Sequence, residues 1–504
     1  DSDILYVKEN FKIRSKLNRE LILKRNLTKE EIARFEVRKY RFPNSFIAER
    51  YSRENLFPYL FSHSVGYVGN LNDDSLQEIL SLQDLSLKET IFKYSNGFLS
   101  GKTGIENVYD QELRGFFGKK IYEVDASGRL LKEIDTIPAI DGKDIHTSLD
   151  LKSQQVAFRE LKNRRGSVVA VDISDGAIVT YLSSPSFSVN KIANGLSQND
   201  FNELIEDKNK PFFDRAAQGR YSPASTIKPA IGLFGLENNI IDWDFTIDDP
   251  GYFELPEDGR IYRGWKKGGH GKINLQDAII ESSNTFFFSL AYKSEIEELI
   301  KHLSYFGFGR NVCLDCFLPD NGLLPNPAWK MNTLNFGWFK GDTVNLGVGQ
   351  GYMSATPLQL AYYSAFIANK GALNKFSFVQ DDKTLPKDVF YIGNIDDKDW
   401  EKIHKSMIGV IEHPKGTAGR LRELKDYIIA AKSGTVELVS TDTKEDYKII
   451  REEEAKRDHA IIVAFGPMPN PKYAVSVVIE NGESGGSVAG PVAIEVLNSL
   501  LDYE

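Results

Sequence analysis

The sequence predicts an α+β fold in which helices pack against a central antiparallel sheet. Two apolar runs at 459–465 and 473–479, separated by a turn rich in glycine and proline, indicate a pair of antiparallel strands. Two further runs at 167–172 and 177–182 flank a Ser-Asp-Gly turn and indicate a β-hairpin. The segment 492–501 places its apolar residues at the spacing of an amphipathic helix. Such a sheet buries its apolar faces against helices, which gives the predicted layers.

We expect two domains, 1–145 and 146–504, of which the second contains the predicted sheet. The first mixes charged helical segments at 28–38 and 85–94 with strand-like pieces such as 120–125. No internal repeat and no low-complexity linker is visible, so we expect a tight junction between the two domains.

The second domain is expected to open at His146–Leu151 and to continue into a helix at 152–162. A chain of 504 residues with 41% hydrophobic content can support two or three domains with cores of their own. Its net charge of −9 argues against nucleic acid as the main partner. The sequence contains no run of about eighteen apolar residues, the length that a membrane-spanning helix requires.

Three short motifs in a fixed order carry the chemistry of the second domain. Ser225–Lys228 reads Ser-Thr-Ile-Lys, Ser282–Asn284 reads Ser-Ser-Asn, and Lys432–Thr435 reads Lys-Ser-Gly-Thr. Together they supply a hydroxyl nucleophile with a lysine three residues later, a hydroxyl with an amide, and a second lysine beside a glycine and two hydroxyls. This is the residue set of an acyl-serine enzyme that uses lysine as its base.

The first motif is expected at the start of a buried helix. An apolar stretch follows Ser225, and Pro229 is tolerated in a first turn, where amides have no intrahelical acceptor. Residues three apart share a helix face, so the Lys228 amine is expected near the Ser225 hydroxyl. Lysine near its usual pKa of about 10.4 is a poor base at neutral pH. Burial and a second ammonium group, for which Lys432 is the candidate, would both lower that pKa.

The third motif lies in an apolar strand that runs from Tyr427 to Val439. Gly434 has no side chain, so a substrate backbone could approach the strand closely at this position.

Beyond the motifs, the chain resembles the class B penicillin-binding proteins, and most of all those of cell elongation. The resemblance covers nearly the whole chain. The matching stretches include 215–221, 249–251, 265–271, 341–343, 349–352, 355–359 and 416–418, with 41–43, 66–69 and 101–106 in the first domain.

This resemblance implies a penicillin-binding-protein transpeptidase fold, preceded by an elongated N-terminal α+β pedestal of the dimerisation type. It implies a peptidoglycan D,D-transpeptidase that cross-links stem peptides ending in D-Ala-D-Ala and is acylated by β-lactam antibiotics. The implied partners are the elongation complex's glycosyltransferase and its membrane scaffold protein, with no nucleic acid and no cofactor. The implied location is the bacterial inner membrane, with a single N-terminal anchor absent from this chain and the catalytic domain in the periplasm. Asp1 falls partway into the family pattern, so we expect a longer natural chain.

The family also implies a role for each motif residue. The catalytic residues would be Ser225, which is acylated, Lys228 as its base, Ser282 and Asn284 in proton relay and substrate holding, and Lys432, which sets the electric field. The substrate-binding residues would be Ser433, Gly434 and Thr435, with the two hydroxyls binding the substrate carboxylate. The backbone amides of Ser225 and Thr435 would form the oxyanion hole.

Two positions depart from the family pattern. Asn284 stands where close relatives often have aspartate, and the two side chains differ in charge. Some members bind a structural zinc through four residues, of which Asp249 and His270 match while Gly264 and Ser283 do not. Two protein ligands rarely make a closed tetrahedral site, so we predict that no metal is bound there.

Cys313 and Cys316 form a single Cys-x-x-Cys pair, which alone is compatible with a redox pair or half of a zinc site. No second pair exists, so we favour plain thiols or an incidental disulfide.

Two alternative functions remain open. A serine β-lactamase or a D,D-carboxypeptidase would use the same nucleophile, but no Glu-x-x-x-Asn pattern follows Asn284 closely and the long first domain suits a lactamase poorly. A penicillin-binding sensor or scaffold would not require a complete catalytic set.

Overall fold

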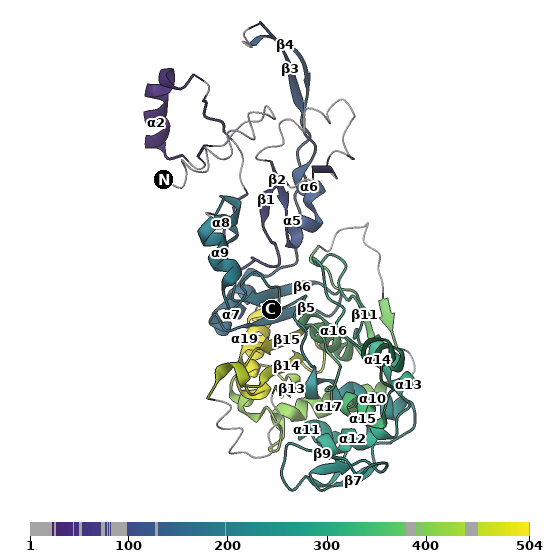
Figure 1. The fold of residues 1–504 in the computed structure, drawn as a ribbon. Helices are drawn as coiled ribbons and strands as arrows, with labels where there is room; N and C mark the ends of the chain where they lie inside the picture. The colour runs from purple at the N-terminus through teal and green to yellow at the C-terminus, as the bar shows by residue number, and fades with distance from the viewer. Residues whose placement is uncertain are drawn as a thin grey trace. The chain divides into compact units, whose positions relative to one another are not determined.

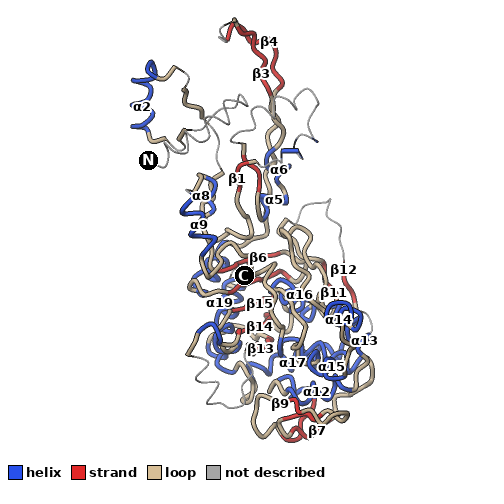
Figure 2. Tube along the Cα trace, viewed as in Figure 1, coloured by secondary structure: helices blue, strands red, loops and turns tan. Residues whose placement is uncertain are grey.

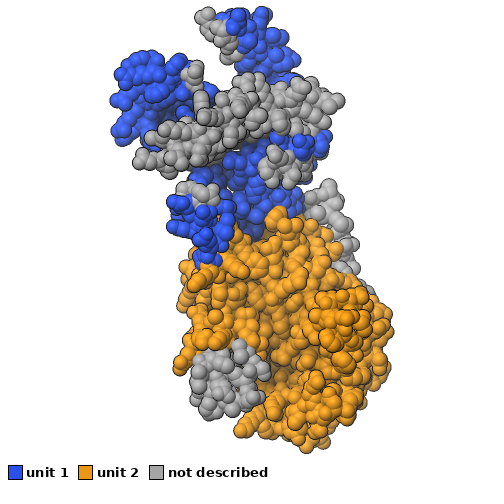
Figure 3. Space-filling model, viewed as in Figure 1, with its two compact units in different colours: residues 1–145, 187–207 blue, residues 146–186, 208–504 orange. Residues whose placement is uncertain are grey.

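The computed structural model divides the chain into two compact units, coloured separately in Figure 3. Unit 1 comprises 1–145 and 187–207, and unit 2 comprises 146–186 and 208–504. The segment 187–207, expected in the second domain, therefore groups with the first unit. The domain boundary and the roles given to the two domains stay predictions. The structure describes residues 23–24, 27–43, 45–49, 53–71, 76–77, 79, 81, 98–126, 130–196, 198–379, 389–392, 395–438 and 452–502.

The described residues of unit 1 form short helices and two small antiparallel strand pairs. The expected helix at 28–38 is present as α2 (Lys29–Arg38), which Thr28 and Glu31 begin with reciprocal side-chain-to-backbone hydrogen bonds. The expected strand at 120–125 is β3, whereas the helix expected at 85–94 lies outside the described residues. The other elements of this unit are η1 (Lys39–Arg41), β1 (Val68–Asn70) with β2 (Leu99–Gly101), α5 (Gly104–Val108), α6 (Asp110–Arg114), β3 (Lys119–Val124) with β4 (Leu130–Ile137), α8 (Val189–Ala193) and α9 (Gln198–Glu206).

Unit 2 is organised around a five-stranded antiparallel sheet, which confirms the predicted fold class (Figure 2). The strand order is β13-β14-β15-β5-β6. The strands are β5 (Gly166–Asp172), β6 (Ile178–Ser184), β13 (Ala430–Val436), β14 (His459–Gly466) and β15 (Tyr473–Ile479). The predicted hairpin is β5 with β6, and the predicted C-terminal strand pair is β14 with β15. The third motif lies on β13, an edge strand of this sheet, with Lys432 opposite Val463.

Helices cover both faces of the sheet, which explains why its inner strands are apolar at nearly every position. Helix α7 (Leu151–Leu161) packs against β6 and against α19 (Gly490–Leu501), and α19 also contacts β14 and β15. Helix α16 (Pro357–Ala368), whose residues are all buried, packs against β5, β14 and β15 from the opposite side (Figure 1). The predicted helices at 152–162 and 492–501 are thus present.

A second group of helices adjoins the edge of the sheet at β13. Its centre is α10 (Lys228–Glu237), an apolar and buried helix that contacts α11 (Leu275–Ile280), α12 (Asn284–Tyr292) and α17 (Asp397–Glu412). The remaining described elements of unit 2 are the 3₁₀ turns η2 (Ala224–Ile227), η3 (Gly419–Glu423) and η4 (Glu454–Lys456), the π-turn η5 (Gly485–Ala489), the helices α13 (Ile296–Tyr305), α14 (Pro327–Leu334) and α15 (Lys340–Leu346), and the strand pairs β7 (Thr246–Asp249) with β10 (Gly271–Asn274), β8 (Tyr252–Glu254) with β9 (Ile261–Arg263), and β11 (Ala372–Asn374) with β12 (Val389–Tyr391). Both η2 and α17 contact β13, so these helices bring distant motifs to the sheet edge.

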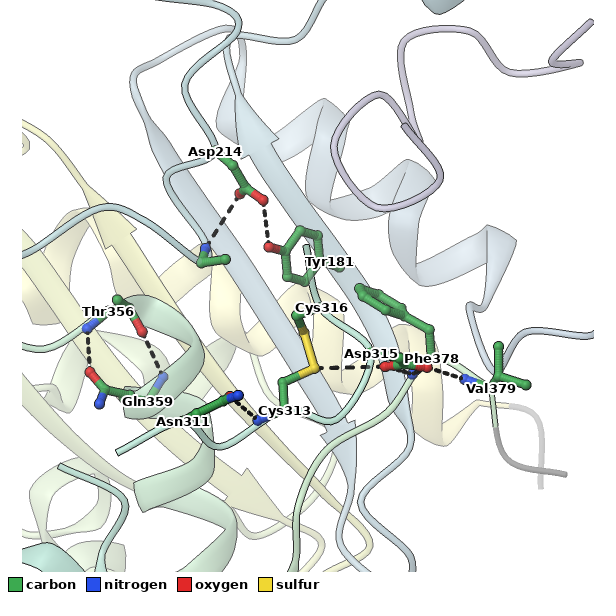
Figure 4. Close-up of a disulfide and its surroundings, with 11 residues drawn as sticks. Tyr181, Asp214, Asn311, Cys313, Asp315, Cys316, Thr356, Gln359, Phe378 and Val379 are labelled. Atoms are coloured by element: carbon green, nitrogen blue, oxygen red, sulfur yellow. Dashed lines mark hydrogen bonds between the residues drawn. A yellow bond between two sulfur atoms is a disulfide. The ribbon is translucent and has the colours of Figure 1, made fainter. Parts of the chain in front are cut away.

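The two cysteines form a disulfide in this structure, drawn in Figure 4. Both are buried, and Asp315 between them accepts hydrogen bonds from the backbone amides of Phe378 and Val379. The disulfide loop is therefore fastened to a neighbouring segment. No helix in the described part of the chain is both long and apolar enough to cross a membrane.

Candidate active site

Ser225 lies in the 3₁₀ turn η2, directly before α10, as the sequence predicts for a serine at a helix start. Its side chain is partly exposed, while the flanking Ala224 and Thr226 are buried. Ala224 adopts a left-handed conformation with φ of 48°, and its amide donates to the carbonyl oxygen of Gly349 at 2.9 Å. This bond fastens the turn that carries Ser225 to the segment that contains Gly349.

The Lys228 amine connects the first motif to the second. It is fully buried, and it donates to the Ser282 carbonyl oxygen at 2.8 Å and to the Asn284 side-chain oxygen at 2.7 Å. The Ser282 hydroxyl lies 3.3 Å from the same nitrogen. Ser282 has a positive φ of 58°, so the turn between α11 and α12 presents both its carbonyl oxygen and its hydroxyl to the lysine.

The Lys432 amine reaches the same hydroxyl from the edge of the sheet. It is fully buried, and it donates to Ser282 Oγ at 2.9 Å and to the Ser433 carbonyl oxygen at 3.1 Å. Two lysines about two hundred residues apart in sequence therefore share one hydroxyl group.

Burial makes both amines unusually acidic. It lowers the pKa of Lys228 well below the usual value, and the charge of Lys432 lowers it further, although Asp249 acts in the opposite direction. Burial lowers the pKa of Lys432 to about 7. A lowered pKa increases the share of neutral Lys228, which is the form that a general base requires.

The third motif presents its polar groups along β13. Ser433 is partly buried, Thr435 is exposed, and the Ser433 and Thr417 hydroxyl oxygens lie 2.9 Å apart. A side chain at Gly434 would come within 3.1 Å of Thr226, so glycine also allows the strand to pack against the turn that carries Ser225. Sequence reasoning did not assign Thr417 to the site, although the Gly-Thr-Ala turn around it was a visible signal.

Trp265 is a second neighbour of the site that the motifs did not reveal. Its indole nitrogen donates to the Ser282 carbonyl oxygen at 3.1 Å, while 57% of the residue is exposed. The same carbonyl oxygen thus accepts from Lys228 and from Trp265, which fixes the second motif from two sides.

The four positions of the family's zinc site do not fit a metal in this chain. The Asp249 carboxylate accepts from the Ser283 hydroxyl at 2.7 Å and bonds His270 Nδ1 at 2.6 Å. Although burial raises the pKa of Asp249, hydrogen bonds from His270, Ser283 and Gly251 outweigh it and hold that pKa below its usual value. His270 Nε2 is buried without a partner among the described residues, but Gly264 offers no side-chain donor and Ser283 is already bonded to Asp249. These contacts join the second motif to β7.

Comparison with known proteins places this geometry in a family. The family model described as the penicillin-binding protein transpeptidase domain matches residues 166–498, and the model described as the penicillin-binding protein dimerisation domain matches residues 2–147. The chain belongs to this family. It is 38% identical to the peptidoglycan D,D-transpeptidase MrdA of Acinetobacter baumannii, over 98% of this chain and 72% of that protein. It is 34% identical to MrdA of Escherichia coli K12, over 95% of this chain and 75% of that protein.

Solved structures agree with the sequence relatives. The crystal structure of Pseudomonas aeruginosa PBP2 in complex with WCK 5153 matches with a TM-score of 0.77 and 36% identity, covering 90% of this chain and 91% of that one. The complex between PBP2 and MreC from Helicobacter pylori matches with a TM-score of 0.79 and 29% identity, covering 94% and 83%. The predicted resemblance is confirmed: the chain is a class B penicillin-binding protein of the PBP2 type, and its enzymatic activity is that of a peptidoglycan D,D-transpeptidase.

Proposed function

We propose that Ser225 carries the acyl group in this peptidoglycan D,D-transpeptidase. Neutral Lys228 takes the proton from the Ser225 hydroxyl, and the serine oxygen attacks the carbonyl carbon of the penultimate D-alanine of a stem peptide. The peptide bond to the terminal D-alanine breaks, and the proton taken from Ser225 passes to the leaving nitrogen, so D-alanine departs as a free amine. An amine of a second stem peptide then attacks the acyl carbon and gives a proton to Lys228. The ester bond to Ser225 breaks, Lys228 returns that proton to the serine oxygen, and the new amide is the cross-link.

The observation that carries this proposal is the Ser282 hydroxyl shared by Lys228 and Lys432. A neutral amine has a lone pair to accept the Ser225 proton, and the hydroxyl beside it can pass a proton onward to the leaving amine. Lys432, whose pKa burial lowers to about 7, donates to the same hydroxyl and places a positive charge beside it when protonated. Asn284, which holds Lys228 through its side-chain oxygen, orients the base although it has no charge.

The third motif is proposed to bind the substrate carboxylate. Ser433 and Thr435 present hydroxyl groups on the same strand as Lys432, and an anionic carboxylate would gain from all three groups. The backbone amides of Ser225 and Thr435 are proposed as the oxyanion hole, which stabilises the negative oxygen of the tetrahedral intermediate. A β-lactam carries both a carboxylate and a reactive carbonyl, so it would bind through the same contacts.

The partners and the location are proposed from the relatives. Because PBP2 of Helicobacter pylori forms a complex with MreC, we assign a similar scaffold protein to this chain, with a glycosyltransferase as the second partner and no nucleic acid. Peptidoglycan is the substrate, so we assign the catalytic unit to the periplasm and an N-terminal anchor to the inner membrane.

The fate of the acyl-enzyme tests the proposed reaction against the hydrolase alternatives. After addition of benzylpenicillin, we expect intact-mass spectrometry to show one adduct per chain. The lifetime of this adduct should be much longer than the time that a β-lactamase needs for one turnover. With a pentapeptide donor and an amine acceptor, we expect release of D-alanine together with the cross-linked product. Rapid return to the unmodified mass would indicate a β-lactamase, and D-alanine release without a cross-link would indicate a carboxypeptidase.

A further inference from the structure

Glu281 is a buried carboxylate immediately before the second motif. The residue is 7% exposed and ends helix α11, next to Ser282. A carboxylate removed from water requires compensation by positive charge or hydrogen bonds. Two lysines supply it, and they come from different loops of unit 2: Lys266 Nζ lies 3.4 Å from one carboxylate oxygen, and Lys415 Nζ lies 3.1 Å from the other.

Each of the two lysines belongs to a loop that contacts the candidate site. Lys415 is two residues before Thr417, whose hydroxyl bonds the Ser433 hydroxyl on β13. Lys266 follows Trp265, whose indole donates to the Ser282 carbonyl oxygen. The side chain of Glu281 therefore links three segments at the candidate site. They are its own segment, which continues into the second motif, the loop that contains Trp265 and Lys266 (the Trp265 loop), and the loop that contains Lys415 and Thr417 (the Thr417 loop).

We propose that Glu281 is a positioning residue that holds the groups proposed to bind the substrate carboxylate in the orientation that binding requires. We refer to Glu281, Lys266 and Lys415 together as the Glu281 clamp. Through Lys415 it fixes the Thr417 loop, and through Thr417 the orientation of the Ser433 hydroxyl. The inference rests on the proposed role of Ser433 in binding the substrate carboxylate.

The proposed clamp and simple electrostatic repulsion predict opposite changes in penicillin affinity when Glu281 is neutralised. A negative charge near a carboxylate subsite repels the substrate, so neutralising Glu281 should on that ground tighten the binding of an anionic penicillin. If instead Glu281 acts by holding the loops, the same change releases Lys415 and Lys266 and weakens binding. The direction of the change therefore separates positioning from charge.

The test measures noncovalent binding of a fluorescent penicillin by anisotropy in chains that carry Ser225→Ala, so that acylation does not intervene. We expect Glu281→Gln and Lys415→Met each to raise the dissociation constant about fivefold, the scale of a single ion pair. The double variant should bind no more weakly than either single variant, because both remove the same contact. Glu281→Asp keeps the negative charge but has a shorter side chain, so it should also weaken binding. This variant replaces Glu281→Gln in the test if the glutamine variant does not fold.

A matched control uses the ion pair between Glu412 and Lys425, whose N···O distance is 2.7 Å and which includes no residue of the three motifs. Glu412→Gln should leave the dissociation constant unchanged. Unchanged or tighter binding in Glu281→Gln, or additive effects in the double variant, would overturn the clamp. Failure of the underlying function appears separately, as absence of any penicillin adduct on the chain with native Ser225.

Discussion

Chains in which alanine replaces Ser225 are expected to form no covalent penicillin adduct and to release no D-alanine. Ser225 is the partly exposed hydroxyl one helical turn before the buried Lys228, and alanine at this position leaves nothing to carry the acyl group. The loss should fall on the chemistry and not on the fold, because the change removes one oxygen from a side chain that is not buried. Intact-mass spectrometry with benzylpenicillin measures the amount of adduct, and thermal unfolding measures the stability of the fold.

Ser222→Ala is a matched control for this experiment. Ser222 lies in the same segment, and its hydroxyl donates to the Gly349 carbonyl oxygen, so the variant perturbs the turn without touching the proposed nucleophile. We expect it to keep the adduct. An adduct of undiminished amount on Ser225→Ala would show that another residue is acylated.

Lys228→Met is expected to lower the acylation rate constant by about a thousandfold, within the range that general bases contribute. Methionine fills a similar volume and carries no charge into the buried site, but it offers no lone pair for the Ser225 proton. The noncovalent affinity for penicillin should change much less, because the proposed carboxylate contacts lie on β13. Stopped-flow fluorescence with a labelled penicillin separates the two constants. A loss of less than about tenfold would assign the base to another group.

The sheet and the three motifs were predictable because their signals are local. The runs at 459–465 and 473–479 have apolar residues and turns that define strands without reference to the rest of the chain, and they became β14 and β15. The position of Ser225 before an apolar helix was likewise a local pattern. The proximity of Lys228 to Lys432 was predicted because a lysine base needs a lowered pKa, which a second ammonium group provides. The structure places both amines at the Ser282 hydroxyl.

The features that escaped prediction depend on contacts between distant segments. No local pattern shows that Glu281 faces Lys415, or that Thr417 bonds Ser433, because each pair is brought together by the packing of α11, α17 and β13. The grouping of 187–207 with unit 1 is of the same kind, since the chain returns to that unit after the first hairpin of the sheet. The state of Cys313 and Cys316 was also left open, because spacing alone fits thiols and a disulfide equally.

The central claim is that burial and the nearby charge of Lys432 together make Lys228 a usable base, and the pH dependence of acylation tests the part played by Lys432 most directly. In the native chain the rate should rise as Lys228 loses its proton, because only the neutral amine accepts the Ser225 proton. It should fall again as Lys432, whose pKa is about 7, loses its charge. Because the Lys432 charge lowers the pKa of Lys228, Lys432→Met should raise that pKa and move the rising limb to higher pH.

The decisive comparison is therefore the acylation rate constant against pH for the native chain and for Lys432→Met, measured with the same fluorescent penicillin. We predict that the rising limb moves to higher pH in the variant and that the falling limb near pH 7 disappears. A rising limb at the same or a lower pH would contradict the account, because it would mean that the charge of Lys432 does not lower the pKa of Lys228.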